Sequence, residues 1–138
     1  MNNIYVLDAC AVLALLKGEE GATIVEDIIV QAKSKICNVY MSKYNLLEIY
    51  YGFYRSDGEI IAEQRMQMIK NSPISTIDYL SDEVFKEAGR LKAKYKISLA
   101  DSVALAETKV KNAQIITSDH HEFDIIEKSE DIQFCWIR

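Results

Sequence analysis

The sequence has no apolar run approaching the roughly 18 to 20 residues that a membrane-spanning helix requires. It begins Met1-Asn2-Asn3-Ile4, without the basic segment and long apolar segment of a secretory signal. We therefore expect a cytoplasmic protein that does not contact a membrane.

Cysteine is scarce, with only Cys10, Cys37 and Cys135 present. Three widely spaced cysteines among apolar neighbours fit neither a disulfide framework nor a CxxC metal site. We predict that all three are small buried side chains in a reducing compartment. At 138 residues the chain is long enough to bury a core without disulfides, and we expect residues 1–138 to form a single domain.

Positive charge is in deficit, because 16 Lys and Arg stand against 21 Asp and Glu and give a net charge of −5. This balance argues against a protein that coats nucleic acid by bulk attraction. It leaves open an enzyme that acts on nucleic acid locally. An excess of carboxylates is also what a divalent-cation site requires.

Several motifs of other enzyme classes are absent. No GxxxxGK[ST] or GxGxxG loop supports nucleotide binding, and no GxSxG elbow supports a Ser-His-Asp hydrolase. His120-His121 have no Cys or His partner at zinc-ligand spacing, and we predict that they lie in a loop. A phosphoacceptor receiver domain would need paired acids after the first strand, whereas Asp8 is followed by Ala9-Cys10.

The sequence does contain an alternation of strand and helix patterns. Short apolar runs predict strands at 4–7, 36–41, 74–77, 114–117 and 132–137. Apolar periodicity and caps predict helices at 9–16, 19–33, 43 to between 55 and 58, 59–70, 81–95 and 99–111. The helix at 19–33 is expected to carry acids in its first turn. This order predicts a three-layer α/β/α sandwich with a central, mostly parallel sheet of four to five strands.

Two acids follow predicted strands. Asp8 comes directly after the first strand, and Asp119 comes one residue after the strand at 114–117. Ligands of open α/β sheets bind at the carboxyl ends of the strands, so both acids are expected at the same edge. The alternative is that each acid only caps the helix that follows.

Two more acids lie in predicted helices. Glu48 stands in an apolar and aromatic stretch with no cation at helical spacing to neutralise it, although a solvent-facing stripe would also explain it. Asp101 follows Ser98 at capping-box spacing, which also lets its carboxylate point off the helix end. Four converging acids would repel one another, and a magnesium ion would remove that cost and activate water for phosphodiester hydrolysis.

Four segments, taken in order, resemble the PIN-domain nucleases and especially the toxins of VapBC-type toxin–antitoxin pairs. These segments are residues 5–11, 42–52, 98–104 and 115–119. The resemblance implies a PIN-like three-layer fold and Mg²⁺- or Mn²⁺-dependent cleavage of RNA. It also implies a homodimer and a cognate antitoxin whose tail occupies the active groove.

The resemblance assigns metal-binding and catalytic roles to four acids, namely Asp8, Glu48, Asp101 and Asp119. It places Thr117 at a hydroxyl position that supports the last carboxylate. Two residues depart from the common pattern: Ala9 replaces a frequent Ser or Thr, and Glu122 replaces a frequent Asp, which leaves its role as an auxiliary ligand open. The alternative is a non-catalytic module of the same fold that binds RNA or a protein partner.

A local basic stretch precedes Asp101. It comprises Lys86, Arg90, Lys92, Lys94 and Lys96. We interpret it as a solvated helix face, with guidance of an RNA backbone toward Asp101 as the alternative.

Overall fold

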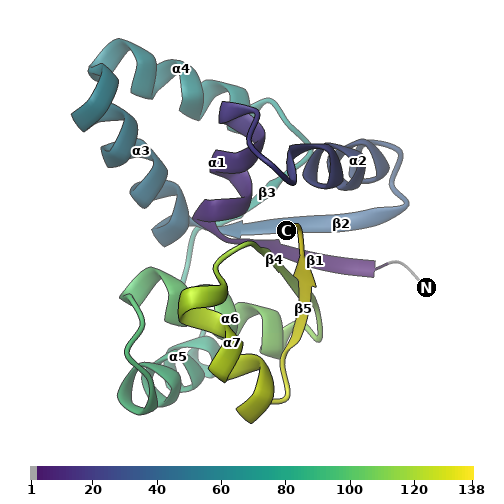
Figure 1. The fold of residues 1–138 in the computed structure, drawn as a ribbon, viewed down its shortest axis with the longest axis vertical. Coiled ribbons are helices and arrows are strands. Elements are labelled where there is room, and N and C mark those ends of the chain that lie inside the picture. Colours follow the sequence, from purple (N-terminus) through teal and green to yellow (C-terminus); the bar gives the residue numbers. More distant parts are fainter. Residues whose placement is uncertain (1–2) are drawn as a thin grey trace.

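A five-stranded parallel sheet forms the centre of the computed structural model, which describes residues 3–138 (Figure 1). The strands are β1 (Asn3–Leu7), β2 (Cys37–Ser42), β3 (Ser75–Ile77), β4 (Gln114–Thr117) and β5 (Gln133–Trp136). Their order is β3-β2-β1-β4-β5, and each neighbouring pair is parallel. Met1 and Asn2, which contributed to the expectation about a signal segment, lie outside the described residues.

Seven helices within residues 3–138 cover the sheet. They are α1 (Ala9–Lys17), α2 (Ala22–Lys33), α3 (Lys43–Asp57), α4 (Glu59–Lys70), α5 (Asp82–Lys94), α6 (Leu99–Val110) and α7 (His120–Ser129). Helices α1 to α4 lie on one side of the sheet and α5 to α7 on the other (Figure 1). The predicted α/β/α sandwich is therefore confirmed. No helix in the described part of the chain is long and apolar enough to cross a membrane.

The alternation of side chains along the strands creates two separate cores. Tyr5 and Leu7 of β1 pack into the cluster formed with α1 to α4, whereas Val6 between them packs into the cluster formed with α5 to α7. In β4, Ile116 and Ile115 divide in the same way. Burial on both faces explains why these strands are continuous apolar runs in the sequence.

Helix α2 begins later than predicted. The sequence pattern suggested a start at Glu19, but Gly21 caps the helix with φ 95°. A Cβ atom at this position would lie 2.7 Å from the carbonyl oxygen of Ile137, so the chain turns here with a glycine. Glu19 therefore lies in the preceding turn, and the expectation of acids in the first turn of this helix is wrong.

The prediction of a loop at His120 and His121 is also wrong, because both residues belong to the first turn of α7. Asp119 caps this helix by accepting a hydrogen bond from the Glu122 amide at 3.1 Å. Phe123 and Ile126, three residues apart, bury its inner face. Because this apolar pattern is so short, the sequence did not predict helix α7.

The three cysteines are free thiols, as expected. Only Cys37 is fully buried, whereas Cys10 and Cys135 are half-buried, which corrects the prediction that all three are buried. Cys10 lies in the first turn of α1, two residues after Asp8, which directly follows β1.

Candidate active site

Asp8 lies at the carboxyl end of β1 and is almost completely buried, with 1% of its surface exposed. Its Oδ1 accepts a hydrogen bond from the Ala11 amide at 2.9 Å and so caps α1. Its carboxylate also accepts a hydrogen bond from the Thr117 hydroxyl. Asp8 therefore does cap α1, as the alternative proposed. The cap does not neutralise its carboxylate, because within residues 3–138 no ion pair involves Asp8.

Thr117 links the first and last acids of the set. Besides its bond to Asp8, its Oγ1 accepts a hydrogen bond from the Asp119 amide at 3.0 Å. The parallel register of β1 and β4 pairs Leu7 with Ile116, which places Asp8 beside Thr117. The Thr117 hydroxyl therefore contacts the carboxylate of Asp8 and the backbone of Asp119.

Asp101 enters the site from the first turn of α6. Ser98 caps this helix by accepting from the Asp101 amide at 3.0 Å, so the predicted cap is present. The Asp101 carboxylate also accepts a hydrogen bond from the Ser98 side chain, which lowers its pKa slightly against the effects that raise it. Burial raises its pKa to about 6, and the charges of Glu48, Asp119 and Glu122 add to this increase.

Glu48 enters from α3, which packs against α6. It is half-buried, and its Oε1 accepts a hydrogen bond from Asn45 Nδ2 at 3.4 Å. Burial raises the pKa of its carboxyl group. The solvent-facing stripe that was considered for Glu48 is therefore absent, because Asn45 at its side has no exposed surface (0%).

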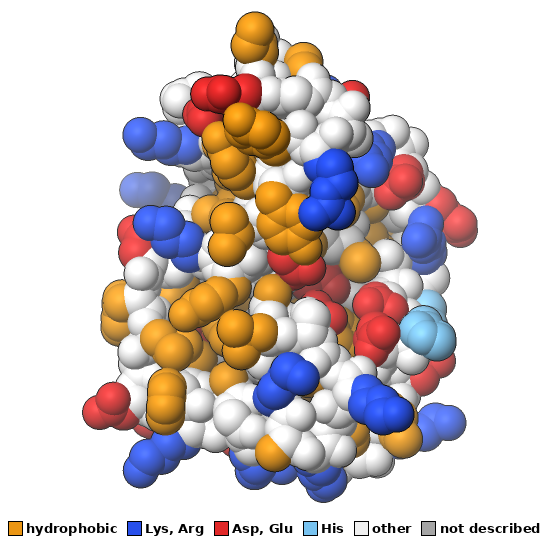
Figure 2. Space-filling model, turned by 90° about the vertical axis from the view of Figure 1, so that its left-hand side faces the viewer, with side chains coloured by type: hydrophobic (Ala, Val, Ile, Leu, Met, Phe, Trp, Pro, Cys, Tyr) orange, Lys and Arg blue, Asp and Glu red, His pale blue; other side chains and the backbone are white. Residues whose placement is uncertain are grey.

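Electrostatic effects show that the four acids converge. Burial is the main reason that the pKa of Asp8 rises to about 7; the charges of Asp101 and Asp119 contribute to this rise, and its hydrogen bonds oppose it. The pKa of the Cys10 thiol is a second indication that the acids lie close together. Burial is the main reason that its pKa rises to about 12, and all four acids contribute to that rise. Figure 2 shows acidic side chains gathered in a hollow in the middle of one face.

Sequence reasoning missed Cys10 and Asn45 as neighbours of these acids. Cys10 resembled one more small residue of an alanine-rich helix. Asn45 would belong to the solvent-facing stripe considered for Glu48, because it precedes Glu48 by three residues. The available signals were spacing: Cys10 follows Asp8 by two residues, and Asn45 precedes Glu48 by less than one helical turn.

The donor set fits a hard divalent cation. Among residues 3–138, no three or more His, Cys, Asp or Glu side chains already form a group able to hold a metal ion. However, Mg²⁺ prefers oxygen ligands and needs only a few from the protein because it retains several waters, and four carboxylates lie close enough for their charges to act on Cys10. Asp8, Glu48, Asp101 and Asp119 are the residues that would hold it.

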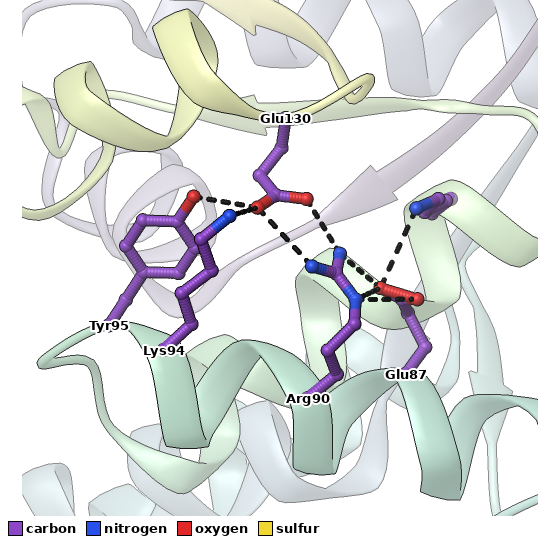
Figure 3. A network of polar contacts seen from close by, with 6 residues as sticks. Glu87, Arg90, Lys94, Tyr95 and Glu130 are labelled. Atoms are coloured by element: carbon purple, nitrogen blue, oxygen red, sulfur yellow. Dashed lines mark hydrogen bonds and ion pairs between the residues drawn. The ribbon is translucent and has the colours of Figure 1, made fainter.

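All five residues of the basic stretch are exposed, as expected for a solvated face, but two of them also form ion pairs. Arg90 Nη2 contacts Glu130 Oε1 at 2.6 Å, and Lys94 contacts Oε2 at 3.3 Å (Figure 3). The Tyr95 hydroxyl donates to the same carboxylate at 2.6 Å. Arg90 and Lys94 therefore tie α5 to the segment between α7 and β5, and they are not simply a solvated face.

The family model of the PIN domain matches residues 5–128, and the chain belongs to this family. No curated protein sequence matches it. Solved structures with the same fold include DNA-bound VapBC from Salmonella typhimurium, with a TM-score of 0.75 and 14% identity over 100% of both chains. VapBC2 from Rickettsia felis, bound to a promoter DNA fragment, has a TM-score of 0.73 and 17% identity over 96% of this chain and 98% of that chain.

A third similar structure is VapC20 from Mycobacterium tuberculosis, described as a toxin that cleaves the sarcin-ricin loop. It has a TM-score of 0.65 and 14% identity over 89% of this chain and 95% of that chain. These identities are low, so the structural likeness establishes the fold, while the family assignment rests on the PIN match.

Proposed function

We propose that this protein is a Mg²⁺- or Mn²⁺-dependent endoribonuclease, the toxin of a toxin–antitoxin pair, with residues 1–138 forming a single PIN-like nuclease domain. The observation that carries the proposal is the burial of Asp8 beside Asp101 and Asp119 without a basic partner in the described chain. A hard cation that also binds phosphate oxygens would neutralise this cluster.

The four acids have distinct supports. The Ala11 amide and the Thr117 hydroxyl fix Asp8, whereas Asp119 is fixed at the N-terminus of α7 by its own capping bond. Asp101 and Glu48 approach from α6 and α3. Glu122 is close enough for its charge to act on Asp101, which is consistent with an auxiliary role. When bound, the cation would lower the pKa of a water molecule and neutralise the phosphoryl oxygens during in-line attack.

RNA as substrate and a small antitoxin protein as partner are supported by the proteins of the same fold. VapC20 is described as cleaving an RNA loop, and the Salmonella and Rickettsia structures are VapBC complexes. The acidic net charge of this chain fits local cleavage better than nonspecific coating of RNA. A cytoplasmic location agrees with such a substrate.

A homodimer is supported by an apolar surface beside the site. Tyr44, Leu47 and Leu80 line a groove of about 330 Å³, and an adjoining hollow includes Phe85 and Leu99. Exposed apolar patches of this kind are typical of interfaces. Phe85→Glu is expected to convert a dimer to a monomer in light scattering, whereas Ile125→Glu, at a similarly exposed residue on α7, is expected to have no effect.

The test of the proposed function is cleavage of RNA by the purified protein with Mg²⁺ or Mn²⁺ and with chelator. Sequencing of RNA ends from cells that express the wild type or Asp8→Asn would then identify the cut sites. Metal-dependent cuts that are lost in the variant are expected. Equal cleavage by a folded Asp8→Asn protein free of wild type would reject the assignment.

The alternative is a non-catalytic PIN module that binds RNA or a protein. The observation in its favour is Ala9, which supplies no hydroxyl beside Asp8 where many relatives carry Ser or Thr. RNA binding without metal-dependent cleavage would support this alternative.

A further inference from the structure

Asn45 is a buried polar residue that the four-acid site does not explain. It lies on α3, three residues before Glu48, and none of its surface is exposed (0%). Its Nδ2 donates to Glu48 Oε1 at 3.4 Å. Its Oδ1 is buried and has no hydrogen-bond partner within residues 3–138.

This arrangement is unfavourable for stability alone. A buried amide oxygen without a partner costs free energy, and an apolar side chain at this position would avoid that cost. The next residues on the inner face of α3 are apolar, namely Ile49 and Phe53. Packing therefore does not explain the choice of asparagine at position 45.

The carboxylate of Glu48 determines the orientation of the amide. An ionised carboxylate only accepts hydrogen bonds, so the NH₂ group of Asn45 must face it. The opposite orientation would bring two acceptor oxygens together. Oδ1 is therefore the atom of the amide that is left buried without a partner.

We infer that Asn45 is a positioning residue of the proposed metal site: its Nδ2 holds the Glu48 carboxylate, whose charge acts on Asp101. This inference rests on the proposed function. Residues that hold metal ligands from behind commonly decide their orientation.

Asn45→Leu tests this role because it removes both polar atoms and keeps the branched shape of the side chain, although leucine is larger than asparagine. We expect Mn²⁺ affinity, measured by calorimetry, to fall about tenfold or more. The metal-free protein is expected to unfold at the wild-type temperature or above, because an unpartnered buried oxygen has been removed. Asn45→Ala provides a second variant if leucine does not pack, and it is expected to show the same loss of affinity.

Thr108→Val is the matched control. Thr108 is also fully buried on a helix, and its hydroxyl donates to the Ala104 carbonyl at 2.7 Å, away from the acids. This control is expected to keep wild-type Mn²⁺ affinity. In a Glu48→Gln background the effect of Asn45→Leu on affinity is expected to shrink, because the carboxylate that Asn45 positions is gone.

The outcomes distinguish failure of the role proposed for Asn45 from failure of the proposed metal site. A wild type that binds Mn²⁺, together with Asn45 variants of unchanged affinity, would overturn the role of Asn45 and leave the metal site standing. A wild type that fails to bind Mn²⁺ or Mg²⁺ would overturn the proposed function and this inference together.

Discussion

Two groups of carboxylates in this protein have opposite environments. Glu130 is nearly buried, with 5% of its side chain exposed, and it is surrounded by Arg90, Lys94 and Tyr95 (Figure 3). The hydrogen bonds from these groups, chiefly from Arg90, lower its pKa to about 2. Asp8 is more deeply buried, with 1% of its surface exposed, but it has no basic partner in residues 3–138, and its pKa rises to about 7.

The difference separates a carboxylate that holds the fold together from one that is ready to bind a ligand. The charge of Glu130 is already neutralised by the protein, so it contributes to folding. The charge of Asp8 is a cost in the metal-free protein, and a cation would remove that cost. Variants of the two residues should therefore have opposite effects on stability, and only the Asp8 variant should lose activity.

The largest expected effect is on catalysis. Asp8→Asn or Asp101→Asn is expected to reduce RNA cleavage about a hundredfold or more, because each loses a charge that the transition state needs for its cation. Glu130→Gln should leave the specific activity of the folded protein near that of the wild type. Single-turnover cleavage of a labelled RNA measures both. A comparable loss of RNA cleavage in a fully folded Glu130→Gln protein would contradict the distinction between a catalytic Asp8 and a structural Glu130.

The next effect is on the stability of the metal-free protein. Asp8→Asn is expected to increase the free energy of unfolding at pH 8 by about 3 kcal/mol, since asparagine keeps the helix cap without the buried charge. The raised pKa of Asp8 means that its charge destabilises the wild type increasingly between about pH 4 and pH 7. Urea unfolding at pH 5 and pH 8 should show the larger gain at pH 8, and an equal gain at both would contradict the assigned pKa.

Glu130→Gln should act in the opposite direction. The lowered pKa of Glu130 contributes stability above its unfolded pKa, and this contribution disappears as the pH falls from about 4.5 to about 2. We expect a loss of about 2 kcal/mol at pH 7, because three groups lose an ionised acceptor. Denaturation curves across this acid range check the sign. A loss that stays constant down to pH 2 would mean that packing, not charge, is responsible.

The sequence predicted the three layers, the parallel sheet and the shared edge of Asp8 and Asp119 because these features depend on local patterns. Apolar runs define buried strands, and carboxyl ends of parallel strands share one edge. What the sequence did not show depends on contacts between distant segments. The pairing of Glu130 with Arg90 joins residues 40 positions apart, and the turn at Gly21 is set by Ile137. Asn45 could not be recognised without knowing that its oxygen is buried and unpartnered.

The most direct measurement is thermal unfolding of the wild type and Asp8→Asn with increasing Mg²⁺ or Mn²⁺. Binding to the folded state at a hundredfold excess over the dissociation constant stabilises by about 2.7 kcal/mol, so the wild type should unfold several degrees higher. The already stabilised Asp8→Asn protein should gain much less. A wild type whose unfolding temperature does not rise at millimolar metal would contradict the central claim that these acids form a cation site.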